Sequence, residues 1–191
     1  MKHFLPLLFT VSLFLIACAG GESDTSEMNP EAFHESFFNT LLAECGSVYT
    51  AESTYPEDEA HPLVGTELRI EIIDCSERQV RMELIRNGDY WHGAWVVEMR
   101  EEGLHLYHDH LGTVRTMDDL GEDDYHGYGG YADGSGNSLT QYFPADDITA
   151  EMIPAATTNV WMLSLVADEN QLVYYLERGE IPRFRAVFTK R

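Results

Sequence analysis

The stretch ELRIEIIDCSERQVRMEL, residues 67–84, decides the fold class. Apolar side chains at Leu68, Ile70 and Ile72 alternate with charged ones, and the same period of two returns at Val80 and Met82 after the polar link SERQ. Such alternation indicates β-strands with one buried face, and the link is short enough for a hairpin. The stretch therefore predicts two antiparallel strands that share one apolar face.

Strands of the same type are expected further along the chain. The expected runs are residues 95–99, 104–110, 137–143, 159–166, 172–178 and 183–189. The region between 112 and 137, rich in Asp, Gly and Tyr, is expected to form a long hairpin tip. Consecutive strands with short links form an antiparallel meander, which removes its exposed edges by closing into a barrel. We therefore expect a mainly β protein, an antiparallel up-and-down β-barrel of lipocalin-like type with about 8–10 strands.

One N-terminal α-helix is expected before the strands. Asn29 and Pro30 supply a helix cap and a first-turn proline, and Gly46 can end the helix. Apolar side chains recur at every fourth residue between them, at Phe33, Phe37, Leu41 and Cys45. This stripe is expected to pack on the barrel, and a partner-binding surface is the alternative.

The first residues resemble a bacterial lipoprotein signal peptide. The apolar run 4–16 is too short to cross a bilayer, and LIAC (15–18) resembles the lipobox, whose cysteine is lipidated and becomes the new amino terminus. The resemblance implies a signal peptide at 1–17, lipidation of Cys18, a flexible tether at 18–30 and a single barrel domain at 31–191. It implies a bacterial cell-envelope protein whose lipid anchor binds the membrane. Ala19 after the cysteine favours the outer membrane.

The charge of the chain limits its partners. There are 33 acidic and 12 basic residues, which gives a formal net charge of −21. Such a surface repels nucleic acid and anionic headgroups, so no nucleic-acid partner is expected. A monomer is expected.

Two cysteines remain besides Cys18. Cys45 and Cys75 are expected to form a disulfide, because two thiols outside the cytoplasm usually pair. A reactive thiol is the alternative.

A histidine-rich stretch, LHLYHDHLGT (104–113), is the most conspicuous candidate site. Strand alternation puts His108 and His110 on one face, and two imidazoles at this spacing can bind one divalent metal ion if a third ligand is near. His126 is the candidate third ligand, and the others are His92, Asp118, Asp119, Glu122, Asp123 and Asp124. The alternative, which we favour, is a hydrogen-bonded rim in which Asp109 and the histidines hold the following acidic loop.

No signature of a nucleophilic enzyme or of phosphate binding is present, so no catalytic residue is assigned. Four aromatic residues are candidates for lining a ligand site in the barrel, or for plain core. They are Trp95, Tyr142, Trp161 and Tyr174. The expected role is binding of a small apolar ligand, with a metal-binding envelope protein or a structural or interaction lipoprotein as alternatives.

Spaced elements of the chain resemble a family of small secreted or lipid-anchored bacterial proteins. The elements lie between Phe37 and Phe188 and include LHLYHDH, GYGGYADG, QYFPAD, TNVW and RFRAVF. The resemblance implies a shared fold and no transferable catalytic residue. GAW (93–95) also resembles the lipocalin G-x-W triplet, although it follows two strands rather than opening the first.

Overall fold

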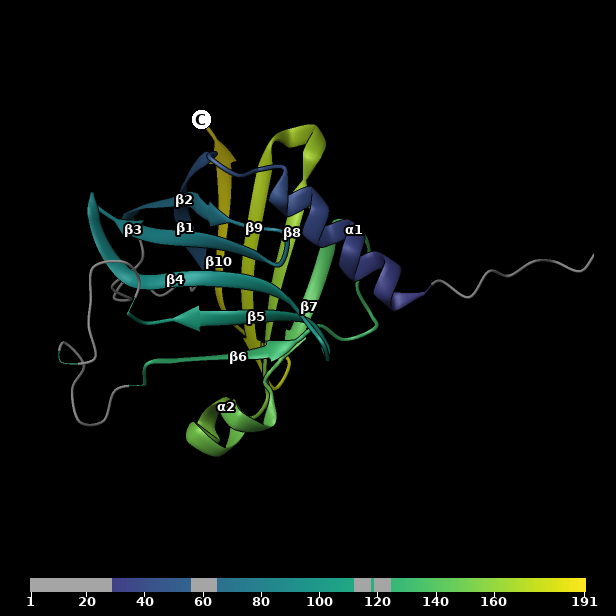
Figure 1. The fold of residues 1–191 in the computed structure, drawn as a ribbon. Coiled ribbons are helices and arrows are strands. Elements are labelled where there is room, and N and C mark those ends of the chain that lie inside the picture. The colour runs from purple at the N-terminus through teal and green to yellow at the C-terminus, as the bar shows by residue number, and fades with distance from the viewer. Residues whose placement is uncertain (1–28, 56–64, 112–117, 119–124) are drawn as a thin grey trace, which may run out of the picture.

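The computed structural model describes residues 29–55, 65–111, 118 and 125–191, with the backbone alone for 52–55 and 90–92 (Figure 1). Its helices are α1 (Pro30–Leu42) and α2 (Asp147–Met152), with single 3-10 turns at Pro154–Ala156 and Ala167–Glu169. Its strands are β1 (Val48–Tyr55), β2 (Glu67–Cys75), β3 (Gln79–Arg86), β4 (Asp89–Arg100), β5 (Gly103–Asp109), β6 (Gly127–Tyr131), β7 (Thr140–Pro144), β8 (Asn159–Val166), β9 (Gln171–Arg178) and β10 (Ile181–Lys190).

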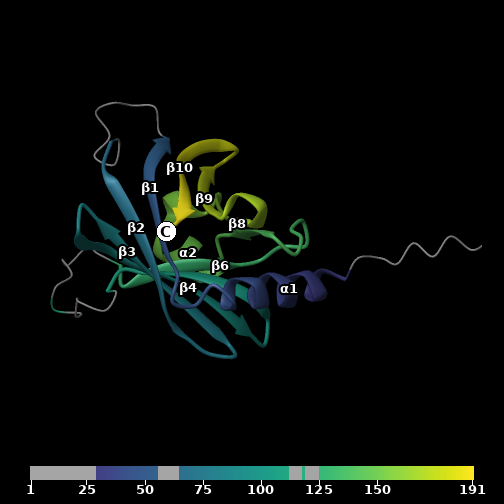
Figure 2. The same cartoon turned by 90° about the horizontal axis from the view of Figure 1, so that it is seen from above.

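These ten strands form one antiparallel, nearly closed barrel. The sheet order is β6-β5-β4-β3-β2-β1-β10-β9-β8-β7, so the first strand pairs with the last. Figure 1 shows β2–β6 running across the direction of β7–β10, and Figure 2 shows β1 and β10 side by side where the sheet curls round. The expected up-and-down barrel of 8–10 strands with one N-terminal helix is confirmed.

The hairpin that decided the fold class forms as expected. Ile70 pairs with Leu84 and Ile72 with Met82 across β2 and β3. These four side chains are at most 5% exposed and belong to the interior core, because alternate residues of each strand point into the barrel. The period of two therefore marks the inner face correctly.

Helix α1 lies across one open end of the barrel (Figure 1). Asn29 caps it by accepting a hydrogen bond from the Glu31 N–H (3.1 Å), and Phe37 and Leu41 are buried in the core. The helix ends at Leu42, before the expected Gly46, and turns carry the chain onward. None of the helices in the described ranges has the length and apolar character that a membrane-spanning helix needs.

A disulfide joins the segment after α1 to the end of β2. Cys45 and Cys75 are bonded, as expected, and lie 30 residues apart in sequence. The cross-link therefore holds the covering helix against the barrel.

Three elements were not expected from the sequence. Strand β1 and the short helix α2 were missed, and β6 occupies Gly127–Tyr131, inside the region expected to be a hairpin tip. The interpretation of 127–131 as part of a tip is therefore wrong. In β6 the backbone pairs regularly with β5, although its sequence GYGGY is dominated by glycine.

Candidate functional site

Aromatic side chains from five strands meet inside the barrel. The Trp95 ring (β4) stacks on Tyr174 (β9) with 4.0 Å between ring centroids, and the Phe188 ring (β10) meets it edge-on at 6.1 Å. Tyr128 (β6) stacks on Trp161 (β8) at 5.5 Å. The structure therefore brings together three of the four residues expected to line a ligand site.

The fourth candidate, Tyr142, is placed elsewhere. It lies in β7 between the fully buried Gln141 and Phe143, and is itself only half-buried. Because neighbouring residues of a strand point to opposite faces and Phe143 belongs to the core, Tyr142 lies on the outer face. The expectation that Tyr142 lines the interior is corrected accordingly.

Two histidines add polar rings to the interior cluster. His108, which is 7% exposed, meets Trp95 with 6.3 Å between ring centroids. Its ring lies 4.9 Å from that of His110, and both lie 5.0 Å from the Tyr128 ring. The alternation expected along β5 is thus observed, since Leu104, Leu106 and His108 are all buried.

The cluster is tightly packed around a buried indole N–H. Trp95, His108, Tyr128, Trp161 and Tyr174 enclose no void that a water molecule could occupy. Within the described part of the chain, the buried Trp95 Nε1 has no hydrogen-bond partner. Burial raises the pKa of the Tyr128 phenol to about 12, so its hydroxyl remains protonated at neutral pH. The site is therefore apolar, with a buried indole donor.

The expected metal site is not assembled from the described residues. His126 contributes its carbonyl oxygen to the His110 N–H (3.1 Å), and its side chain is exposed. No group of three or more His, Cys, Asp or Glu side chains that could hold a metal ion occurs within those residues. The other proposed third ligands Asp119, Glu122, Asp123 and Asp124, and the His92 side chain, lie outside them, and Asp118 is exposed.

The expected rim is present in part. Asp109 accepts the Leu111 N–H (2.9 Å), which holds the chain where β5 ends. It also binds the Arg81 guanidinium (2.8 Å), which binds the buried Glu83 carboxylate (2.8 Å). The acidic loop that this rim was expected to hold lies outside the described residues.

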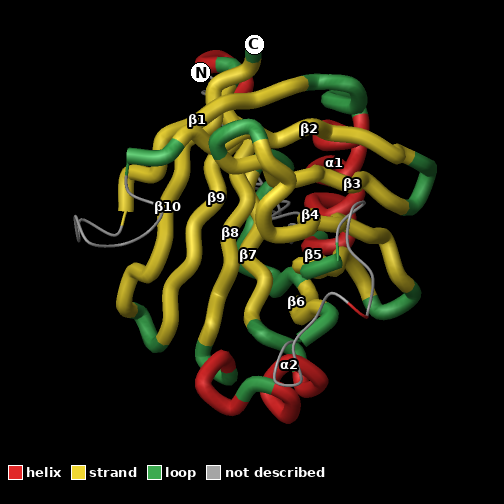
Figure 3. The backbone as a smooth tube through the Cα atoms, turned by 90° about the vertical axis from the view of Figure 1, so that its left-hand side faces the viewer, coloured by secondary structure: helices red, strands yellow, loops and turns green. Residues whose placement is uncertain are grey.

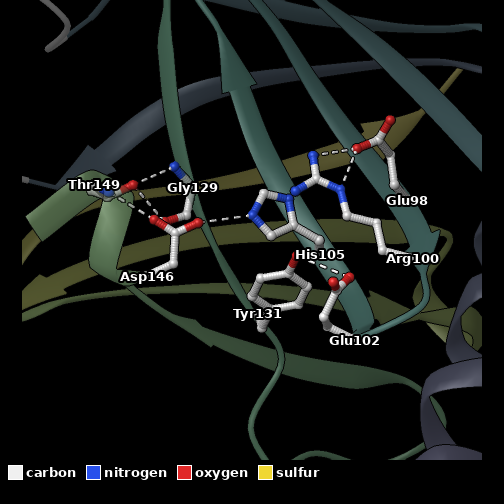
Figure 4. A network of polar contacts seen from close by, with 8 residues as sticks. All are labelled: Glu98, Arg100, Glu102, His105, Gly129, Tyr131, Asp146 and Thr149. Carbon is white, nitrogen blue, oxygen red and sulfur yellow. Dashed lines mark hydrogen bonds and ion pairs between the residues drawn. The ribbon is translucent and has the colours of Figure 1, made fainter. Parts of the chain in front are cut away.

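His105 belongs to a different cluster on the outer face of the barrel (Figure 4). It is 1% exposed, and its Nε2 lies 3.1 Å from Asp146 Oδ2. A carboxylate only accepts hydrogen bonds, so this nitrogen carries the proton. The Tyr131 ring packs edge-on against the imidazole at 4.6 Å. Burial lowers the pKa of His105, with the Arg100 charge acting in the same direction and Asp146 opposing both.

The His105–Asp146 pair lies where the barrel ladder is interrupted. We call this break between β6 and β7 the seam; α2 lies below it in Figure 3. The Gly129 N–H donates to Thr149 Oγ1 (2.8 Å) and the Thr149 hydroxyl donates to the Gly129 carbonyl (2.8 Å). The Asp146 N–H also donates to that carbonyl (3.1 Å). Helix α2 thus satisfies the Gly129 backbone groups in place of a neighbouring strand.

Glycine is required in β6 because backbones approach this strand closely on both sides, from Pro144 across the seam and from Leu106 of β5. A Cβ on Gly130 would lie 1.8 Å from the Pro144 carbonyl oxygen, and one on Gly129 would lie 2.1 Å from the Leu106 oxygen. The glycine pair in GYGGY was the available sequence signal for this contact, since such pairs mark close backbone approach. Asp146 caps α2 by accepting the Thr149 N–H, and an aspartate at this position is a typical helix-start signal in a sequence.

Comparison of the chain with protein-family models, curated proteins and solved structures finds no significant match. Function must therefore be argued from the geometry of this chain alone.

Proposed function

We propose that this chain is a lipid-anchored protein of the bacterial envelope whose barrel binds a small, mainly apolar ligand that carries a hydrogen-bond acceptor. The observation that carries the proposal is the Trp95 indole N–H, which is buried among aromatic rings and has no hydrogen-bond partner among the residues that the structure describes. The anchor and the location rest on the LIAC tetrapeptide and on Cys18.

A buried donor without a partner is costly to the folded protein. Leaving such a group unsatisfied costs about 1–3 kcal/mol, which a ligand acceptor would recover. Filling the position with phenylalanine would avoid the cost and keep the packing with Tyr174. The indole at position 95 is therefore better explained by a bound acceptor than by packing alone.

The surrounding residues fit the same ligand. Trp161, Tyr128 and His108 present flat aromatic surfaces that suit a planar apolar body. Since the rings leave no void, the ligand takes its place only when part of the cluster moves. Tyr128, the half-buried member, is the ring that we expect to move.

The proposal is tested with two probes of equal size. The full-length protein in lipid vesicles is incubated with 2-naphthaldehyde, which has an acceptor oxygen, or 2-methylnaphthalene, which has none. Binding is measured as depletion of free probe relative to protein-free vesicles. We expect the aldehyde to bind about fivefold tighter, as one net hydrogen bond implies. Trp95→Phe should abolish this preference, and Tyr142→Phe, on the outer face, should leave it unchanged.

Three results contradict the proposal: no probe bound above the vesicle background, equal affinity for both probes, or a preference that survives in Trp95→Phe. Native mass spectrometry of protein purified from its source adds an independent readout. A retained apolar mass is expected, whereas an empty protein that co-purifies with an envelope partner would favour the interaction alternative.

The anchor is tested separately. Metabolic labelling with an alkyne analogue of palmitate should label the wild-type chain in the membrane fraction, and Cys18→Ser should lose the label. An unmodified Cys18 thiol on a chain found inside the cell would refute the envelope assignment.

A further inference from the structure

The seam differs from every other junction in the barrel. All other neighbouring strands in the sheet order are joined by antiparallel ladders, with seven residue pairs between β4 and β5 and five between β7 and β8. At the seam the described connections to the middle of β6 come from α2 and its N-cap residue, through Thr149 and the Asp146 N–H on Gly129. The Asp133 N–H adds one bond to the Tyr142 carbonyl (2.9 Å) just beyond β6.

The residues behind the seam belong to the interior site. Tyr128 is next to Gly129 in β6 and stacks on Trp161 of β8, on the far side of the break. The same phenol ring meets His108 and His110. Movement of β6 away from α2 would therefore separate the Tyr128–Trp161 stack and uncover the aromatic cluster.

Local opening is easiest where few hydrogen bonds must break. Elsewhere in the barrel, opening breaks an antiparallel ladder of backbone pairs. At the seam it breaks two bonds of the Thr149 hydroxyl and the backbone bonds from Asp146 and Asp133. The Asp146 carboxylate holds Thr149 in place by accepting its N–H. His105 supports Asp146 from β5 through its 3.1 Å contact (Figure 4). We call Thr149, Asp146 and His105 the seam clamp.

We propose that the seam is the entrance through which a ligand reaches the interior, and that the seam clamp sets the rate of opening. This inference rests on the proposed ligand-binding function. His105 lies on the outer face, Thr149 in α2 and Asp146 at its N-cap, all outside the aromatic cluster, so the clamp controls rates rather than affinity.

The test compares two threonines that each make an inter-element hydroxyl bond. Thr149→Val removes both hydroxyl bonds to Gly129 at nearly constant volume. The control, Thr140→Val, removes a 2.8 Å hydroxyl bond to Ser164 across the continuous β7–β8 ladder. Binding of 2-naphthaldehyde is followed by stopped-flow quenching of tryptophan fluorescence. We expect Thr149→Val to raise association and dissociation rates about tenfold each, with the equilibrium constant within twofold of wild type, and Thr140→Val to change neither rate.

Two further variants guard against simple misfolding. Thr149→Ser keeps the hydroxyl and should restore the wild-type rates. Asp146→Asn keeps the helix cap while weakening the His105 contact, and should raise both rates about threefold. Equal rates in Thr149→Val and Thr140→Val, with the probe bound normally, would place the entrance elsewhere and overturn the inference. Absence of probe binding by the wild-type chain would overturn the proposed function instead.

Discussion

Replacing Gly130 by alanine adds one carbon atom between β6 and β7 and so tests how closely the two strands approach at the seam. The added Cβ would lie 1.8 Å from the Pro144 carbonyl oxygen and 2.7 Å from its carbon. A carbon and an oxygen normally stay at least about 3.3 Å apart, so the two backbones must separate by about 1.5 Å. The Asp146–Gly129 bond, now 3.1 Å long, would not survive such a separation.

The cost follows from the contacts that are lost. Overpacking of this kind costs about 1–3 kcal/mol. Losing the seam bonds made to Gly129 adds about 0.5–1.5 kcal/mol for each bond. Some of the strain is relieved when β6 and β7 move apart, so we expect the free energy of unfolding to fall by about 3 kcal/mol in total. For a domain of this size that corresponds to a melting temperature lower by about 6–12 °C.

Urea unfolding followed by tryptophan fluorescence gives the free energy of unfolding. The control is Gly134→Ala, whose Cβ would meet Pro30 at an ordinary 3.6 Å and should change the free energy by less than about 0.5 kcal/mol. If Gly130→Ala matched Gly134→Ala, the close approach at the seam would be refuted.

Three further changes test other parts of the account. Removing the disulfide in Cys45→Ala/Cys75→Ala should lower the free energy of unfolding by about 3.6 kcal/mol, the chain-entropy value for a closed loop of 30 residues. Folding lowers the pKa of His105, so as the pH falls the unfolded chain binds a proton at this histidine before the folded chain does. The free energy of unfolding should therefore keep its full value above the ordinary histidine pKa and decrease as the pH falls below that pKa. Arg81→Met should cost about 3–5 kcal/mol, because it leaves the buried Glu83 carboxylate unpaired.

Each of these changes has its own control. The reduced wild-type chain should match the double alanine variant, and equal stability of the oxidised and reduced forms would contradict the entropy argument. His105→Gln should remove the decrease in the free energy of unfolding just below the ordinary histidine pKa. The decrease at lower pH, where Asp146 becomes protonated, should remain, because the pKa of Asp146 is also lowered. Arg69→Met, beside the more exposed Glu71, should cost less than about 1 kcal/mol.

The fold class could be predicted because strand alternation is a local signal. In β2 and β8 the residues alternate between the two faces of the sheet, and their apolar residues fill the barrel. Strand β6 could not be predicted because its GYGGY sequence lacks an alternation of apolar and polar residues. Its place in the barrel is determined by close approach to β5 and to Pro144, which are distant in sequence.

For the candidate site, the sequence could predict only which face of the sheet each residue occupies, and not which residues it contacts. The alternation along β5 placed His108 inside correctly. His105 has the opposite parity along the strand and lies on the outer face. That His105 is nevertheless buried depends on Asp146, 41 residues further along the chain. Tyr142 was expected on the inner face because a strand normally turns its polar residues, such as Gln141, outward. Gln141 is buried instead, and the core residue Phe143 takes the inner face, so Tyr142 between them points outward.

The most direct test of the central claim is the ¹⁵N–¹H resonance of the Trp95 indole, assigned by its absence in Trp95→Phe. Titration with 2-naphthaldehyde should move this resonance downfield and slow the exchange of its hydrogen with solvent, while 2-methylnaphthalene should produce neither effect to the same extent. A Trp95 indole resonance that stays unchanged at saturating aldehyde would contradict the account.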